Sequence, residues 1–247
     1  MGNFSAANFI SDLDRFYARE DVAGATDFLE KQYELADASG DLSAKLTILN
    51  EMTGCYRQNG NKEKGLKAIE EALALVEKTG NSATVSGGTI ILNCATTLKS
   101  FGKSRESLEY YSRAERILTS LLDKNDPLLA GLFNNMALAL QDTGDSASAE
   151  KYFLKAIEIT LADERNALET AVSYVNLAHL LFEENPLDER VDSLMNKALT
   201  ILENPRYFNY PRYAFTCRKC APSFGYFGYF VKEKELNERA DKAYAGN

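Results

Sequence analysis

The feature that most constrains this 247-residue chain is an internal repeat with a period of 42 residues. An alanine recurs five times at this spacing, and a glycine keeps the same register with Pro186 in its fourth place. Besides the alanine and glycine columns, four columns of apolar residues share the period. The columns are Ala72, Ala114, Ala156, Ala198 and Ala240; Gly60, Gly102, Gly144 and Gly228; Leu75, Ile117, Ile159 and Ile201; Leu49, Ile91 and Phe133; Met52, Cys94 and Met136; and Tyr56, Leu98 and Leu140. Coincident columns at one period predict stacked copies of one supersecondary unit.

Residues 133–159 show most clearly what one copy is. Phe133, Met136 and Leu140 recur at helical spacing, and Gly144 follows in a turn signal. A second amphipathic run continues through Phe153. The apolar faces of this helix-turn-helix hairpin exceed what one hairpin can bury, so it should stack on its neighbours. We therefore expect an all-α, right-handed superhelical solenoid of about six antiparallel hairpins.

The repeat boundaries predict a single solenoid domain over residues 1–247. Its expected parts are a degenerate N-terminal hairpin (3–40), four repeats (41–82, 83–124, 125–166 and 167–208) and a C-terminal capping repeat (209–247). In the fourth repeat the columns slip by one residue, which predicts a longer turn around Pro186. Pro222 falls inside the first helix of the last repeat and should bend or break it near Arg218.

The columns resemble a known family. The run Leu49, Met52, Tyr56, Gly60, Gly65, Ile69 and Ala72, and the corresponding residues from Phe133 to Ala156, are similar to tetratricopeptide repeats. The usual period of that family is about 34 residues, so the longer units here resemble those of kinesin light chains. HEAT and armadillo repeats have periods near 42, but the small-residue columns and the turn glycine favour tetratricopeptide repeats. The resemblance implies a superhelix whose concave side commonly holds an extended peptide.

Composition and charge exclude several classes of binding partner and cellular location. The net charge of −8 argues against a nucleic-acid backbone or an anionic membrane as the partner. No apolar run is long enough to span a membrane, and the N-terminus from Met1 to Ala6 lacks the charged and apolar regions of a signal peptide. The four cysteines are expected to be buried apolar side chains in a reducing compartment. Together these features predict a cytoplasmic protein.

No constellation for catalysis is recognisable. The chain has one histidine, and it lacks a glycine-rich phosphate loop and the motifs of serine hydrolases and zinc proteases. Cys217 and Cys220 could form half a zinc site or a redox pair, but no second such pair exists. We therefore expect no enzyme activity, no catalytic residues, no metal site and no cofactor.

Binding residues should lie on the first helix of each hairpin, at positions that packing does not use. An asparagine column is the clearest signal, because an amide can pair with a peptide backbone through both its donor and its acceptor. The alternative is that these amides bond to neighbouring helices. Arg57 and Lys99 could bind a carboxylate or be solvated, and Glu51, Leu92 and Gln141 interrupt any dense clamp of the chaperone-tail type. The candidate groove residues are Asn50, Arg57, Asn93, Lys99, Asn134, Asn135, Leu138, Asn176 and His179.

Ten aromatic residues lie between Tyr207 and Phe230. They either seal the end of the solenoid or form a sticky surface for a partner or for homo-oligomerisation. The expected function is non-catalytic binding of a protein or an extended peptide in the concave groove. A peptide-sensing regulatory module and an architectural oligomerisation module are the alternatives.

Overall fold

The computed structural model describes residues 4–19, 21–210 and 212–245. The expectation about a signal peptide rests on Met1 to Ala6, of which the first three lie outside the described residues. Pro211 and the last two residues of the expected capping repeat lie outside them too. Within the described residues, twelve α-helices pack as six consecutive hairpins in an all-α arrangement. This confirms the predicted fold class.

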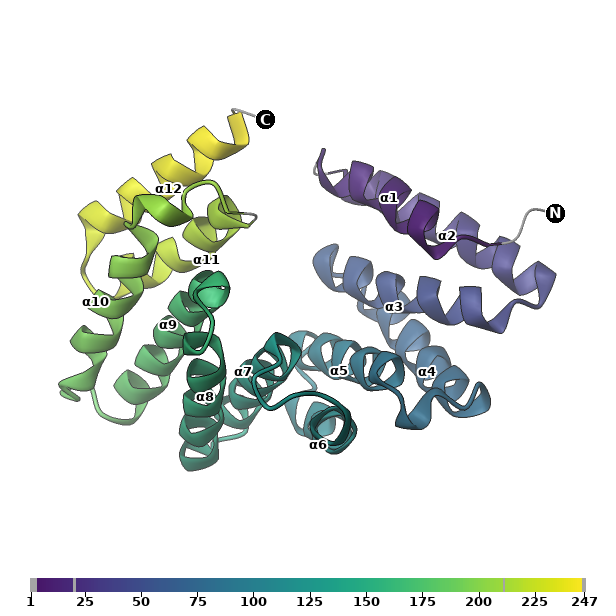
Figure 1. Ribbon diagram of the computed structural model, residues 1–247, viewed down its shortest axis with the longest axis horizontal. Coiled ribbons are helices and arrows are strands. Elements are labelled where there is room, and N and C mark those ends of the chain that lie inside the picture. The colour runs from purple at the N-terminus through teal and green to yellow at the C-terminus, as the bar shows by residue number, and fades with distance from the viewer. Residues whose placement is uncertain (1–3, 20, 211, 246–247) are drawn as a thin grey trace. The chain divides into compact units, whose positions relative to one another are not determined.

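Residue contacts divide the chain into two compact units, Met1–Leu122 and Asp123–Asn247. The first unit contains three hairpins (Figure 1). Its helices are α1 (Ala6–Tyr17), α2 (Val22–Ser39), α3 (Leu42–Gln58), α4 (Lys62–Lys78), α5 (Val85–Ser100) and α6 (Ser104–Leu121). The first helices of its two regular repeats, α3 and α5, contact each other, and α4 also packs on α5.

The second unit repeats this arrangement. Its helices are α7 (Pro127–Asp142), α8 (Ser146–Leu161), α9 (Ala167–Glu184), α10 (Arg190–Leu202), α11 (Tyr213–Tyr226) and α12 (Phe230–Ala245). The first helices α7, α9 and α11 are neighbours in that order, and α8 packs on α9. Figure 1 shows the three hairpins following one another in teal, green and yellow. The expected domain of residues 1–247 and its repeat limits stay a prediction.

The turn between two helices of a hairpin follows from its sequence. Gly144 has φ +84°, a left-handed conformation that glycine adopts without strain. The next residue, Asp145, accepts a hydrogen bond from the backbone N–H of Ser148 and so caps α8. The same order of glycine and capping residue occurs at Gly60 and Asn61. One dipeptide therefore ends the first helix and starts the second.

Two irregularities distinguish the later hairpins. Between α9 and α10 the connection has five residues, 185–189, whereas the connection between α7 and α8 has three, 143–145. This agrees with the expected longer turn at Pro186. Pro222 was expected to bend or break α11; it does not break it, since α11 is helical without interruption from Tyr213 to Tyr226, and the bend stays a prediction. Proline removes a single N–H there, and the packing of α11 on α9 and α12 holds the helix.

The alanine column lies at the centre of the packing. Ala72, Ala114, Ala156, Ala198 and Ala240 are all fully buried, with 0% of their surface exposed. A methyl group lets two helices approach more closely than a larger side chain would. The large buried residues Tyr111 and Phe153 lie one turn before the alanine on the same helix, and Phe224 lies on α11, the partner of α12; they fill the remaining space. The column thus fixes helix separation, while the aromatic residues supply the buried apolar area.

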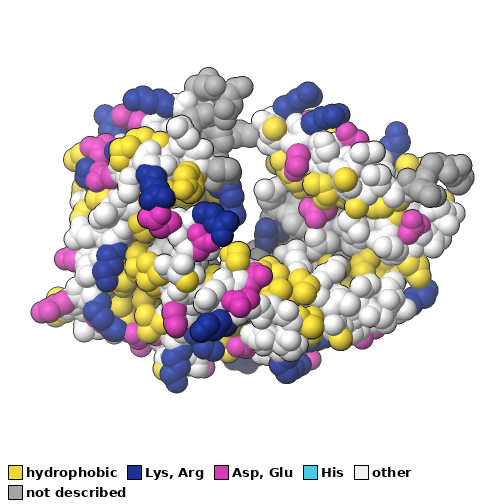
Figure 2. All heavy atoms as spheres, in the orientation of Figure 1, with side chains coloured by type: hydrophobic (Ala, Val, Ile, Leu, Met, Phe, Trp, Pro, Cys, Tyr) yellow, Lys and Arg dark blue, Asp and Glu magenta, His cyan; other side chains and the backbone are white. Residues whose placement is uncertain are grey.

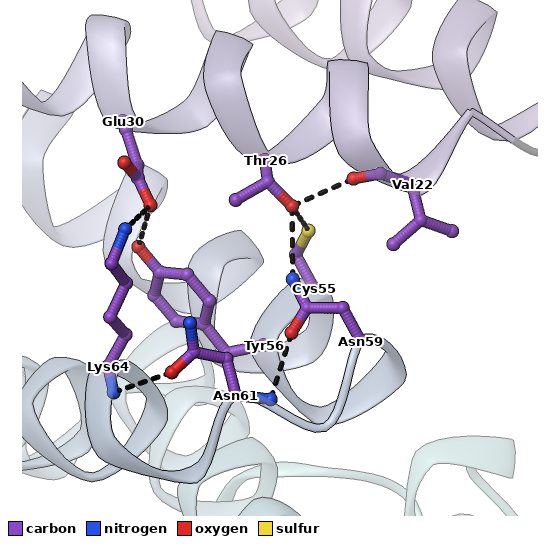
Figure 3. Close-up of polar contacts among 8 residues, drawn as sticks. All are labelled: Val22, Thr26, Glu30, Cys55, Tyr56, Asn59, Asn61 and Lys64. Carbon is purple, nitrogen blue, oxygen red and sulfur yellow. Dashed lines mark hydrogen bonds and ion pairs between the residues drawn. The ribbon is translucent and has the colours of Figure 1, made fainter.

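A polar seam joins three helices of the first unit (Figure 3). Glu30 of α2 accepts hydrogen bonds from the Tyr56 hydroxyl of α3 at 2.9 Å and from Lys64 Nζ of α4 at 2.6 Å. The bond from Lys64, followed by that from Tyr56, lowers the pKa of Glu30. Thr26 contacts Cys55 Sγ at 3.2 Å beside this group. The degenerate first hairpin is thereby tied to the first regular repeat.

Candidate functional site

The asparagine side chains of the second unit bond across neighbouring first helices. Asn176 Nδ2 on α9 donates to Asn134 Oδ1 on α7 at 3.0 Å, and Ser173 Oγ contacts the same oxygen at 3.3 Å. Asn134 is only 9% exposed. Its carbonyl oxygen therefore has two partners on α9, which fixes the orientation of its amide group.

The first unit has a related pair of asparagines, but its hydrogen bonds continue to a glutamate. Asn93 Nδ2 on α5 donates to Asn50 Oδ1 on α3 at 2.8 Å, and Asn50 Nδ2 donates to Glu51 Oε1 at 2.9 Å. This chain of amides ends on a carboxylate. Burial, with a smaller contribution from Asp14, raises the pKa of Glu51. In both units the amide column therefore bonds to the adjacent repeat, as the alternative interpretation of the sequence allowed.

A cavity of about 330 Å³ lies on the first-helix side of the second unit. It is lined by residues of three helices: Asn134 and Asn135 of α7, Val172 and Ser173 of α9, and Phe215, Thr216 and Lys219 of α11. Helices α7, α9 and α11 each contribute residues from their N-terminal halves. The cavity thus lies where three successive repeats meet, which is the kind of concave site that takes a ligand side chain.

The rim of this cavity is charged. Arg212 lies at the N-terminus of α11 with φ +70°, its guanidinium 5.5 Å from the centre of the Phe215 ring and 3.6 Å from Glu169 of α9. Lys219 adds a second cation. Neither α9 nor α11 has a side-chain hydrogen bond at its N-cap. Uncapped helix N-termini leave N–H groups available and carry a partial positive charge.

The other predicted groove residues lie outside this cavity. Arg57 is exposed near the C-terminal end of α3, and Lys99 is half-buried near the end of α5. Leu138 is half-buried on α7. Of the nine predicted residues, the cavity brings together Asn134 and Asn135. A binding role for each of the nine stays a prediction.

His179 contacts the last hairpin. Its Nε2 lies 2.9 Å from Ser223 Oγ, and its ring lies 5.1 Å from that of Tyr226 and 4.8 Å from that of Phe227. Burial lowers the pKa of His179, and nearby Glu183 opposes this shift. The imidazole therefore helps to pack α9 against α11 in its neutral form.

The aromatic C-terminal region divides into two sets. Tyr207, Tyr213 and Phe224 are buried and belong to the core. Tyr226 and Phe230, by contrast, are 61% and 70% exposed, and Val231 beside them is 69% exposed. On the face shown in Figure 2, hydrophobic side chains of the second unit lie in separate patches between charged ones. The region therefore contributes to the core of the last hairpin and also leaves apolar surface exposed on it.

The cysteine side chains are internal. Cys55, Cys94, Cys217 and Cys220 are buried and form no disulfide. Burial raises the pKa of Cys94 and of Cys220 to about 12. Within the described ranges no three side chains of His, Cys, Asp or Glu are grouped as metal ligands. No helix in the described part of the chain combines the length and the apolar character that crossing a membrane requires.

Sequence reasoning missed Ser173, Arg212 and Phe215, which have no counterpart in the asparagine column. One signal was available for Lys219, because it follows Asn135 by 84 residues, which is two periods of 42. It occupies the place of the column in the last repeat. The site is therefore partly periodic and partly specific to α11.

Comparisons with known proteins place this geometry in context. The family model described as tetratricopeptide repeat matches residues 130–163. No curated protein matches the sequence.

Several solved structures share the fold. A putative kinesin light chain with nearly identical TPR-like repeats from Podosopora anserina is 17% identical, covers 79% of this chain and 93% of its own, and has a TM-score of 0.65. BtubC (BKLC) from P. vanneervenii is 18% identical over 93% of this chain and 91% of its own, with a TM-score of 0.62. PilF from Pseudomonas aeruginosa is 14% identical over 98% and 93%, with a TM-score of 0.55. At these identities the likeness concerns the fold.

Proposed function

Because the chain contains a tetratricopeptide repeat at residues 130–163 and has the fold of kinesin-light-chain-like repeat proteins, we propose that it is a non-catalytic scaffold that binds an extended peptide. Repeats of this fold typically bind proteins or peptides and are usually non-catalytic. The peptide would lie along the first helices of the second unit, over the cavity between α7, α9 and α11.

The observation that carries this proposal is the composition of the cavity wall. A half-exposed aromatic ring, Phe215, lies beside polar groups supplied by Asn134, Ser173 and Thr216. Specific peptide sites combine an apolar surface with a few fixed polar groups in this way. Three consecutive helices contribute to the wall, so a bound segment would contact more than one repeat.

A peptide-display experiment tests the proposal. Random 12-residue peptides are selected on the full-length chain, and the dissociation constants of the selected peptides are measured by fluorescence anisotropy. Val172→Trp fills the cavity from α9 and should weaken binding at least tenfold. Leu154→Trp places the same side chain on the exposed surface of α8 and should leave binding unchanged. Binding by Val172→Trp as tight as by wild type would exclude this site.

A second candidate function is homo-oligomerisation through the last hairpin. Tyr226, Phe230 and Val231 expose apolar surface around the turn between α11 and α12, and aromatic residues are enriched in the cores of protein interfaces. Multi-angle light scattering should show a mass above the 27.4 kDa of the monomer, and Phe230→Ser with Val231→Ser should restore the monomer mass. A monomeric wild type at high concentration would rule this candidate out.

A further inference from the structure

We propose that the aromatic cluster where α9 and α11 end is a second binding surface, which takes an arginine side chain of a partner protein. The cluster consists of His179 and Phe182 of α9 and of Tyr226 and Phe227 at the end of α11. The guanidinium group would lie on the exposed Tyr226 ring and pair with Glu183. This surface is separate from the cavity, to which the same helices contribute their N-terminal halves.

The rings of the cluster hold one another in place. Phe182 lies edge-on to Tyr226 and to Phe227, with ring centres 5.7 and 5.4 Å apart, and the rings of Tyr226 and Phe227 are 5.1 Å apart at 87°. Edge-to-face contacts of this kind are favourable and directional. Tyr226 is still 61% exposed. A fixed aromatic ring with an accessible face attracts a cation through its quadrupole.

The chain itself shows how such a ring is completed. At three other places an aromatic ring, a carboxylate and a cation of the chain form a triad. The triads are Tyr33, Glu71 and Lys45; Phe215, Glu169 and Arg212; and Phe208, Glu203 and Arg239. In this order the cation lies 4.8, 5.5 and 5.4 Å from the ring centre and 2.5, 3.6 and 3.9 Å from the carboxylate.

The group at Tyr226 has the ring and the carboxylate without the cation. In the part of the chain that the structure describes, no lysine or arginine lies over a ring of the cluster and no ion pair includes Glu183. Glu183 Oε2 accepts a hydrogen bond at 2.6 Å from Gln141 Nε2 of α7, which positions the carboxylate and leaves its charge. Burial lowers the pKa of His179 and the charge of Glu183 opposes this shift, so that charge reaches the cluster. A partner's cation would complete a fourth triad.

The surroundings favour a cation as well. The C-terminus of a helix carries a partial negative charge, and α9 ends at Glu184 and α11 at Tyr226. The Glu184 carboxylate accepts a hydrogen bond from Ser146 at 2.6 Å and keeps its charge. A net charge of −8 attracts a basic partner to the chain. Arginine fits better than lysine, because a planar guanidinium stacks on a ring while its N–H groups pair with a carboxylate.

The single histidine of the chain makes a test specific to this surface. The ring of His179 lies 5.1 Å from that of Tyr226, so its Hε1 resonance in proton NMR should report a cation bound there. Nα-acetyl-argininamide at millimolar concentration and neutral pH should shift this resonance saturably. Nα-acetyl-citrullinamide has a similar shape without the charge and should not shift it. Equal shifts with the two compounds, or no shift with either, would overturn the proposal.

Variants identify the two groups that would hold the guanidinium. Tyr226→Leu removes the ring and Glu183→Gln removes the charge, and each should weaken binding of Nα-acetyl-argininamide about threefold. Tyr110→Leu on α6 and Glu158→Gln on α8 make the same changes elsewhere and should leave binding unchanged. Circular dichroism checks that all four variants fold. Wild-type affinity in both Tyr226→Leu and Glu183→Gln would refute the assignment.

A display experiment extends the test to a partner segment. Random 12-residue peptides are selected on the Val172→Trp chain, in which the cavity is filled. They should share an arginine, and its replacement by citrulline should weaken binding about tenfold. Peptides without a common arginine, or a dimer in light scattering that Tyr226→Leu dissociates, would contradict the proposal, the dimer by showing a second copy on this surface. Since the cavity is filled here, neither result bears on the peptide site between α7, α9 and α11.

Discussion

Phe153 offers the sharpest test of how the repeats are held together. It is fully buried on α8, while the next residue, Leu154, is 50% exposed. An aromatic side chain buries about 150–250 Å², which at about 25 cal/mol/Å² corresponds to about 4–6 kcal/mol. Since alanine retains part of this and the cavity adds a cost, Phe153→Ala should destabilise by about 3–5 kcal/mol. Leu154→Ala should cost about 1 kcal/mol or less.

Two measurements would check this prediction. Urea unfolding followed by circular dichroism gives the shift in stability for each variant. Repeat arrays can unfold in parts, so hydrogen exchange with mass spectrometry should locate the loss. Peptides of α7, α8 and α9 should lose protection in Phe153→Ala. Equal destabilisation by the two variants, or unchanged exchange in these helices, would refute the packing account.

Three further predictions concern turns, protonation and thiols. Gly144→Ala should destabilise the fold by about 1 kcal/mol because Gly144 has a positive φ. Gly54→Ala, in mid-helix with open space at Cβ, should stabilise it by a similar amount. The midpoints of urea unfolding measure both changes, and shifts of the same sign would contradict the prediction. Burial lowers the pKa of His179, so the unfolded chain binds its proton first and stability should fall as pH drops below about 6.5. Thermal melts should show this loss in the wild type, whereas the offset between wild type and His179→Gln should stay constant above that pH. With pKa values of about 12, Cys94 and Cys220 should resist a thiol reagent at pH 8 until urea unfolds the chain.

The repeat period was sufficient to predict the fold because it records buried positions. Ala72, Ala156 and Ala240 are equivalent by sequence, and all three are fully buried. Period and turn glycines also locate the helices closely. The expected break at Pro222 was wrong, because the effect of the proline depends on the packing of α11 against two neighbours as well as on local sequence.

The candidate site was less predictable for a geometric reason. Sequence columns identify equivalent positions in successive repeats. Side chains that touch across adjacent first helices, however, are not always at equivalent positions. Asn176 corresponds by column to Asn135 yet bonds to Asn134, 42 residues away. Arg212 and Phe215 belong to the irregular start of α11, so no column contains them. Periodicity therefore indicated the face and could not give the contacts.

The sequence left two interpretations of the asparagines open, a structural bond between helices and a contact with a ligand. In the second unit these interpretations are connected. The bond from Asn176 engages the oxygen of Asn134, a residue that also lines the cavity. If the repeats separated there, Asn134 would lose both its partner and its fixed orientation. Packing between α7 and α9 and binding at the cavity should consequently be lost together, which neither a purely structural nor a purely ligand-binding asparagine would produce.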